Sequence, residues 1–184
     1  YNWRGAFAIH TWIATKRRDA TQYSVYQVTG WGRPAVMAQH GSPDRLWYGA
    51  PPELLLERRG PGVDALIDRI EAAVAVYPYT NEYRVWPGPN SNTFTAFVAR
   101  RVPELGLDLP PTAIGKDYLP GGQVLGRMPS GSGWQVSVYG LLGLGLAREE
   151  GIELNILGLA AGIDFKDLAL RLPGVGWLSM LPHG

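Results

Sequence analysis

The sequence predicts one α+β domain in which helices pack on an antiparallel sheet. Three observations indicate this class: two β-forming segments near the N-terminus flank a short polar turn, two stretches with helical character follow, and further β-forming segments fill the C-terminal part. A chain of 184 residues suffices for one well-buried core and is short for two, so we expect a single domain over residues 1–184.

The first predicted strand covers residues 6–15, where both alternating faces are largely apolar, as in a well-covered strand. The polar turn 16–21 leads into a second β-forming segment, 22–30, so the two strands are expected to form an antiparallel hairpin. Short apolar pieces at 35–38 and 46–48 are expected to extend the same sheet.

Two helices are predicted in the middle of the chain. Residues 62–76 place apolar side chains at helical spacing with charged residues between them. A second helix is expected to begin near Ser91, after a Pro- and Gly-rich stretch, and to stop before Pro103. The following segment, 103–133, is rich in Pro and Gly, and its length is typical of a functional loop such as a lid.

The C-terminal part is predicted to form strands at 134–143 and 152–165, joined by a turn near 149–151. The uncharged stretch 128–147 has the length of a bilayer span, but Pro and Gly interrupt it, so it is interpreted as a loop followed by a buried strand. Four carboxylates in this part are interpreted as solvated, namely Glu149, Glu150, Asp164 and Asp167.

The composition excludes several function classes. Seventeen basic and sixteen acidic residues leave a formal charge of +1, and the basic residues form no stripe, so nucleic acid is not an expected partner. The absence of cysteine excludes disulfides, thiolate metal sites and a cysteine nucleophile. The three histidines have no metal-binding spacing, and Gly140, Gly143 and Gly145 do not form a nucleotide fingerprint. No metal and no cofactor is expected.

One group of residues could carry chemistry. Ser91 lies at a helix start, where backbone N–H groups and the helix dipole favour a developing negative charge. Serine needs a base, and His10 is the candidate. Either Gln27 or Tyr26 could orient the His10 ring, and Gln27 lies opposite His10 if the hairpin turn centres near residues 18–19. The residues expected to bind substrate or to stabilise an oxyanion are Asn90, Asn92, Thr93, Tyr83 and Trp12.

A purely structural interpretation of the same residues stays open. Ser and Asn are ordinary N-cap residues, so residues 90–92 could simply cap the helix. His10 could be a buried histidine that donates to a backbone carbonyl. The two interpretations differ in whether the Ser91 hydroxyl lies within hydrogen-bond reach of the His10 ring in an open pocket.

The segments HTWIA, NEYRVWPGPNSNTFTAF and LPPTAIGKDYLPG resemble a bacterial family of envelope proteins that has no established activity. Many of its members carry an N-terminal hydrophobic segment, which fits the start at Tyr1. The resemblance therefore implies a domain anchored at the inner membrane, on its periplasmic side, from which a preceding anchor or signal has been removed.

A more distant resemblance is to the circularly permuted papain-like group, which includes NlpC-type peptidases and lecithin:retinol acyltransferase-like enzymes. In that group, Asn-Cys-x-x-Phe carries the nucleophile and follows a strand histidine. The resemblance implies a permuted papain-like fold in which Ser91 takes the place of the cysteine, His10 that of the base, and Asn90 precedes the nucleophile.

Two functions follow from these observations. The first is a serine hydrolase or acyltransferase that uses a Ser-His dyad on an amide or ester of a peptide or lipid-like substrate in the cell envelope. The second is a catalytically inactive envelope or membrane-complex subunit that binds a ligand or a membrane-protein partner. A third possibility, a purely structural subunit of a membrane assembly, would instead show large exposed apolar patches together with a buried or filled groove.

Overall fold

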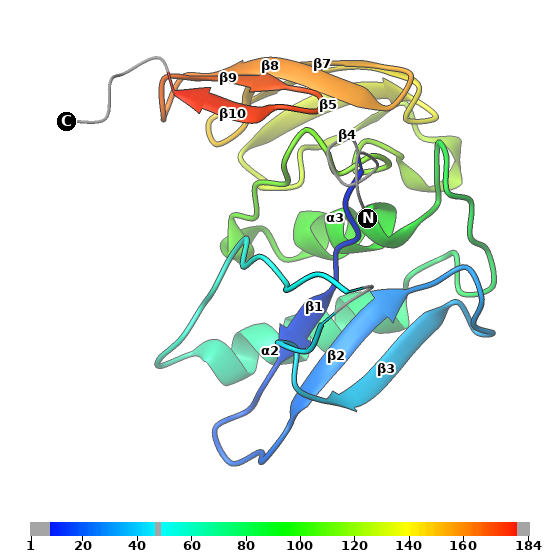
Figure 1. Ribbon diagram of the computed structural model, residues 1–184, viewed down its shortest axis with the longest axis vertical. Helices are drawn as coiled ribbons and strands as arrows, with labels where there is room; N and C mark the ends of the chain where they lie inside the picture. Colours follow the sequence, from blue (N-terminus) through cyan, green and yellow to red (C-terminus); the bar gives the residue numbers. More distant parts are fainter. Residues whose placement is uncertain (1–7, 47–48, 180–184) are drawn as a thin grey trace.

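The computed structural model describes residues 8–46 and 49–179. These residues form two antiparallel sheets and two α-helices, which confirms the α+β class (Figure 1). A three-stranded sheet lies at one end of the molecule, a seven-stranded sheet lies at the other, and α3 lies between them. The expected pieces at 6–7 and 47–48 lie outside the described residues.

The first sheet has the order β1-β2-β3 and contains β1 (Ile13–Thr15), β2 (Tyr23–Val28) and β3 (Val36–Gly41). The helices are α2 (Val63–Ala75) and α3 (Ser91–Arg101), and two short 3-10 helices follow, η1 (Pro103–Leu105) and η2 (Pro120–Gly122). The second sheet is a meander of consecutive antiparallel strands, namely β4 (Leu125–Arg127), β5 (Gly133–Val138), β6 (Leu142–Ala147), β7 (Gly151–Ile156), β8 (Leu159–Asp164), β9 (Ala169–Leu172) and β10 (Gly176–Ser179).

The N-terminal hairpin forms as predicted, but its first strand is shorter than expected. The strand β1 begins at Ile13, which pairs with Tyr26, and His10 precedes the strand. The backbone before β1 bonds elsewhere: Ile9 N donates to Thr112 O at 3.2 Å, and Ile9 O accepts from Asn92 Nδ2 at 3.0 Å. Because these backbone groups have partners outside the sheet, the ladder with β2 ends at Ile13.

The main core lies between the first sheet and the two helices. Val28 of β2, Phe94 and Val98 of α3, and Ile70 of α2 belong to one buried apolar cluster. Tyr77, which follows α2, packs edge-on against Phe94 with the ring centroids 5.2 Å apart. The apolar spacing of α2 matches the face that it buries, whereas α3 is buried on all sides from Ser91 to Ala99.

The expectation of a lid over residues 103–133 is wrong. Leu105, Leu107, Leu109 and Leu119 are buried, and the first three belong to the main core cluster. A segment held by this many buried apolar side chains cannot open without exposing them to water. The segment instead connects α3 to the second sheet.

Three expectations about the C-terminal part are also wrong. The predicted strands 134–143 and 152–165 each contain a turn, so the first covers β5 and the start of β6, and the second covers most of β7 and all of β8. The strands β5 and β6, expected to be buried, bury one face only, since their residues alternate between buried and exposed positions. Of the four carboxylates expected in solvent, Glu150 and Asp164 are buried. Glu150 accepts from Ser130 N at 2.9 Å, and Asp164 accepts from the backbone N–H of Lys166 at 2.9 Å, so local donors compensate their burial.

In the part of the chain that the structure describes, no helix has the length and apolar character needed to cross a membrane.

Candidate functional site

The start of α3 is fixed by its N-cap residue, Asn90. Asn90 Oδ1 accepts from the backbone N–H groups of Asn92 and Thr93, both at 3.0 Å, and Asn90 N donates to Thr93 Oγ1 at 3.1 Å. This reciprocal pattern is a capping box, and it satisfies N–H groups that a helix start leaves without intrahelical partners. The helix therefore begins at Ser91, as the sequence predicted.

Buried amide and hydroxyl groups attach this helix start to the neighbouring chain. Asn90 Nδ2 donates to Val85 O at 3.1 Å and to Ile114 O at 3.0 Å. Asn92 Nδ2 donates to Ile114 O at 2.9 Å, and Thr93 Oγ1 donates to Gly115 O at 2.8 Å. The side chains of Asn90, Asn92 and Thr93 thus have structural partners.

These bonds bear on the expected oxyanion donors. The N–H groups of Asn92 and Thr93, which were candidates, are bonded to Asn90 Oδ1 and do not point to a substrate in this structure. The Asn90 side chain does not accept a hydrogen bond from the backbone N–H of Ser91. It remains the candidate donor at the positive end of the helix.

The residue after His10 holds the N-terminal segment against this helix start. The Thr11 hydroxyl lies 2.9 Å from Thr95 Oγ1, 3.0 Å from Asn92 Oδ1 and 3.4 Å from Ser91 O. Thr11 is itself buried. The chain that carries His10 therefore runs beside the first turn of α3, which carries Ser91.

The His10 ring contacts the glutamine that the hairpin predicted. His10 Nε2 lies 3.3 Å from Oε1 of Gln27, a buried residue on β2. An amide oxygen can only accept, so a hydrogen bond at this contact requires the tautomer that carries its proton on Nε2. Burial lowers the pKa of His10 below its ordinary value of 6.5, and the bond to Gln27 opposes that shift. The ring is therefore neutral near pH 7.

Ser91 and His10 are not bonded to each other. Among the hydrogen bonds of the described residues there is none between the Ser91 hydroxyl and the His10 ring, and Ser91 is only 3 % exposed. Two hollows of the described structure, of about 10 Å³ and about 640 Å³, border neither residue. The bond in an open pocket that distinguishes the hydrolase interpretation is therefore not observed between these two described residues.

The two remaining predicted residues, Trp12 and Tyr83, have different surroundings. Trp12 is half-buried, and its ring centroid is 6.1 Å from that of His10. Tyr83 is also half-buried, and its ring covers Gly30, where a Cβ atom would come within 2.9 Å of it. Both aromatic side chains could border a substrate, and burial raises the pKa of Tyr83, so its phenol stays protonated at neutral pH.

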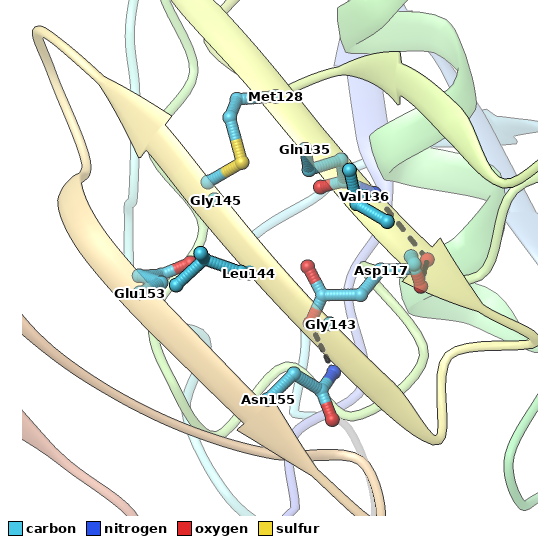
Figure 2. Close-up of a pocket in the computed structure, with 10 residues that line it drawn as sticks. Asp117, Met128, Gln135, Val136, Gly143, Leu144, Gly145, Glu153 and Asn155 are labelled. Carbon is cyan, nitrogen blue, oxygen red and sulfur yellow. Dashed lines mark hydrogen bonds between the residues drawn. The ribbon is translucent and has the colours of Figure 1, made fainter.

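Sequence reasoning missed a buried polar cluster beneath the second sheet. Lys116 contacts Glu153, and Asn155 donates to Asp117 at 2.5 Å. Figure 2 shows the cavity of about 10 Å³ among Asp117, Glu153 and Asn155, which has the size of one water molecule and is too small for a substrate. The available signal was the polar residue at every second position of β7, Glu153 and Asn155, from which no prediction was made.

Within residues 8–46 and 49–179, no group of three or more His, Cys, Asp or Glu side chains has an arrangement that could hold a metal ion.

The fold and the site define a mixed α+β protein that holds a partly buried His-Gln pair beside a helix start bearing a serine. Residues 1–118 match the family described as "Protein of unknown function (DUF3750)", and the chain belongs to this family. Neither the curated proteins nor the solved structures gave a match. The matched residues include His10, Gln27 and Ser91 and end before the second sheet begins at Leu125.

Proposed function

We propose that this protein is a serine hydrolase or acyltransferase that acts on an amide or ester in the cell envelope. The observation that carries the proposal is the contact between His10 Nε2 and Gln27 Oε1, next to the helix start that bears Ser91. A base nitrogen, a residue that orients it and a serine at a helix N-terminus are the components of a serine-histidine acyl-transfer site.

In the proposed reaction, Ser91 Oγ attacks the substrate carbonyl carbon while His10 Nδ1 takes the hydroxyl proton. The electron pair of the C=O bond moves to the oxygen, and the Ser91 backbone N–H stabilises that oxyanion. Collapse of the intermediate breaks the bond to the leaving amine or alcohol, which takes the proton from His10. Water or a second alcohol or amine then releases the acyl group by the same steps. Substrate binding has to bring Ser91 Oγ and the ring together.

The resemblance to permuted papain-like enzymes supports this assignment, because it places Ser91 and His10 at the nucleophile and base positions. A peptide or a lipid-like acyl compound is the proposed substrate class, bordered by Trp12 and Tyr83. The resemblance to envelope proteins supports a position on the periplasmic side of the inner membrane, with an anchor. The proposal requires no cofactor.

A second candidate is an envelope or membrane-complex subunit that binds a ligand or a protein partner without turnover. The specific observation in its favour is the capping box, in which Asn90 takes up the N–H groups of Asn92 and Thr93. Under this proposal Ser91 is a buried helix residue and the His10–Gln27 pair is part of the core packing.

A fluorophosphonate probe distinguishes the two functions, since it labels an activated serine whatever the substrate. The parent chain is expected to be labelled, and Ser91→Ala and His10→Ala are expected to lose labelling at least 100-fold. Ser42→Ala is the matched control, because Ser42 is an accessible serine whose hydroxyl only accepts from Asp44 N. A folded parent that shows no labelling, or labelling that survives Ser91→Ala, would reject the hydrolase proposal.

A further inference from the structure

The second sheet presents its polar face to the protein interior. The inward-facing residues of β5 and β7 are Gln135, Ser137, Glu153 and Asn155, and all four are buried. Their contacts are polar: Ser137 Oγ donates to Asp117 O at 2.6 Å, and Asn155 donates to the Asp117 carboxylate at 2.5 Å. A one-sided antiparallel sheet normally buries its apolar face, so the orientation here is inverted.

The opposite face of the same sheet consists of three rows of apolar side chains. Strand register aligns these rows across the sheet, because residues that pair directly point to the same face. The first row is Leu125, Val136, Leu144, Leu154 and Ala161. The second row is Arg127, Trp134, Leu146, Ile152, Ile163, Leu170 and Leu178. The third row is Val138, Leu142, Ile156 and Leu159.

We call this surface the apolar sheet face, and it is exposed. The larger side chains of β5 to β8 on this face range from 39 % exposed at Leu159 to 63 % at Leu146. Arg127, at the β4 edge, is the one charged residue in the three rows, and it stacks on the Trp134 ring at 4.7 Å. A contiguous apolar surface of this kind is rare on a monomeric protein and marks an interaction site.

We propose that the apolar sheet face packs against the same face of a second copy of this chain, as in a two-sheet sandwich. Two antiparallel sheets pack face to face when the side chains of both faces are apolar and interdigitate. Two copies of the apolar sheet face meet the first of these conditions. A two-fold axis through the face would make the contact closed, with the same patch on both copies.

The size of the face fits this occupant. The central strands have six residues each and are therefore about 20 Å long, and neighbouring strands lie about 4.8 Å apart. The seven-stranded sheet therefore has a flat area of roughly 500–600 Å². The accessible area of the protruding side chains exceeds the flat area, so each copy would bury close to the roughly 800 Å² per partner of a standard interface.

The charge pattern favours a second copy over a lipid surface. A protein that lies on a bilayer typically gathers cations around its apolar face, and the rows here hold only Arg127, which is at one edge. The aliphatic centre, without charged residues, is typical of homodimer interface cores. The proposal does not depend on Ser91 chemistry, because the face lies on strands that contain none of the proposed catalytic residues.

Sedimentation equilibrium or light scattering of the 184-residue chain tests the proposal. The parent is expected to show twice its monomer mass of 20.1 kDa at micromolar concentration. Leu144→Glu and Leu154→Glu change directly paired residues at the centre of the face, and each is expected to weaken dimerisation at least 100-fold. Leu54→Glu is the matched control, since Leu54 is 72 % exposed and lies outside the sheet. Circular dichroism verifies that each variant is folded.

A crosslinking experiment tests the face-to-face geometry, and the absence of native cysteine makes it clean. Leu144→Cys is expected to give an oxidised dimer, and Leu54→Cys is expected not to. A parent that stays monomeric up to high micromolar concentration would overturn the proposal. Binding of the monomer to phospholipid vesicles, lost in Leu144→Glu, would overturn it in favour of a bilayer surface. Fluorophosphonate labelling is read separately, so failure of the dimer and failure of the hydrolase remain distinguishable.

Discussion

At the scale of single residues, the protonation of His10 determines what the candidate site can do. Burial disfavours the imidazolium ion, and Gln27 Oε1 holds the Nε2 proton of the neutral ring. A neutral imidazole with its lone pair on Nδ1 can accept the proton of a serine hydroxyl, whereas an imidazolium cannot. The same burial makes His10 a determinant of stability.

The rate of fluorophosphonate labelling is expected to rise with pH as His10 loses its proton, with a midpoint below 6.5 and a plateau at neutral pH. Gln27→Ala removes the bond that raises the pKa of His10, so the midpoint is expected to move further toward acid. The maximal rate is also expected to fall about 10-fold, because the ring loses its orienting partner. A midpoint above 6.5, or one that Gln27→Ala leaves in place, would contradict this assignment.

Stability gives a readout of His10 that does not need activity. Because the folded pKa is lowered, the stabilising contribution of the neutral ring is complete above pH 6.5 and is lost as pH falls through the folded pKa. Urea denaturation at a series of pH values is expected to show this decrease in the parent and to show less of it in His10→Gln.

At the scale of elements, the start of α3 depends on one side chain. Asn90 supplies the acceptor for two helix N–H groups and the donor for two loop carbonyls, and it is almost completely buried. Gly115 lies against it, and a Cβ there would come within 2.5 Å of the Asn90 amide. The helix start is therefore rigid, which suits a serine that must be positioned.

Asn90→Ala is expected to lower the free energy of unfolding by about 2–3 kcal/mol, since it removes an N-cap and leaves Val85 O without this donor. Chemical denaturation monitored by circular dichroism measures the change. Asn81→Ala is the matched control at an exposed asparagine and is expected to leave the midpoint unchanged. A loss in Asn90→Ala no larger than in the control would show that the cap does not limit stability.

At the scale of the whole molecule, buried ion pairs connect the second sheet to the rest of the protein. Arg171 of β9 is completely buried and binds the Asp108 carboxylate through two bonds of 2.6 and 2.9 Å. Lys116, in the same connecting segment, contacts Glu153 of β7. Apolar packing usually holds a sheet on a core, and here these ion pairs take that role. The second sheet and the connecting segment each supply the partner for a buried charge of the other, so neither is stable without the other.

The parent chain is expected to unfold in one cooperative transition, with coincident curves from tryptophan fluorescence and circular dichroism. Asp108→Ala removes the two-bond carboxylate partner of the buried Arg171, leaves Glu153 as its remaining carboxylate partner among the described residues, and is expected to cost about 3 kcal/mol. Asp68→Ala breaks a solvent-exposed pair with Arg17 and is expected to leave the transition close to the parent's. Two separate transitions in the parent would indicate two independent units.

Local pattern was sufficient for much of the fold and for part of the site. Apolar spacing located α2, the Pro-rich break located the start of α3, and β-formers around a polar turn predicted the first hairpin. The expected register of the hairpin put His10 opposite Gln27. In the observed register Ile13 pairs with Tyr26, so a continuation of the ladder would put Trp12 opposite Gln27. His10 still reaches Gln27, because a shift of two residues keeps a side chain on the same face.

The sequence by itself determined the α+β class, the two helices and the first hairpin, because these follow from periodicity and turn chemistry over short distances. The contact of His10 with Gln27 was expected from a hairpin register that differs from the observed one, so the tertiary structure decided it. Only the tertiary structure decided that the second sheet turns its polar face inward. That choice depends on Asp108, Lys116 and Asp117, which lie far along the chain from several of their partners and reach the sheet only after folding. Alternation along a strand defines two faces, and long-range contacts decide which of them is buried.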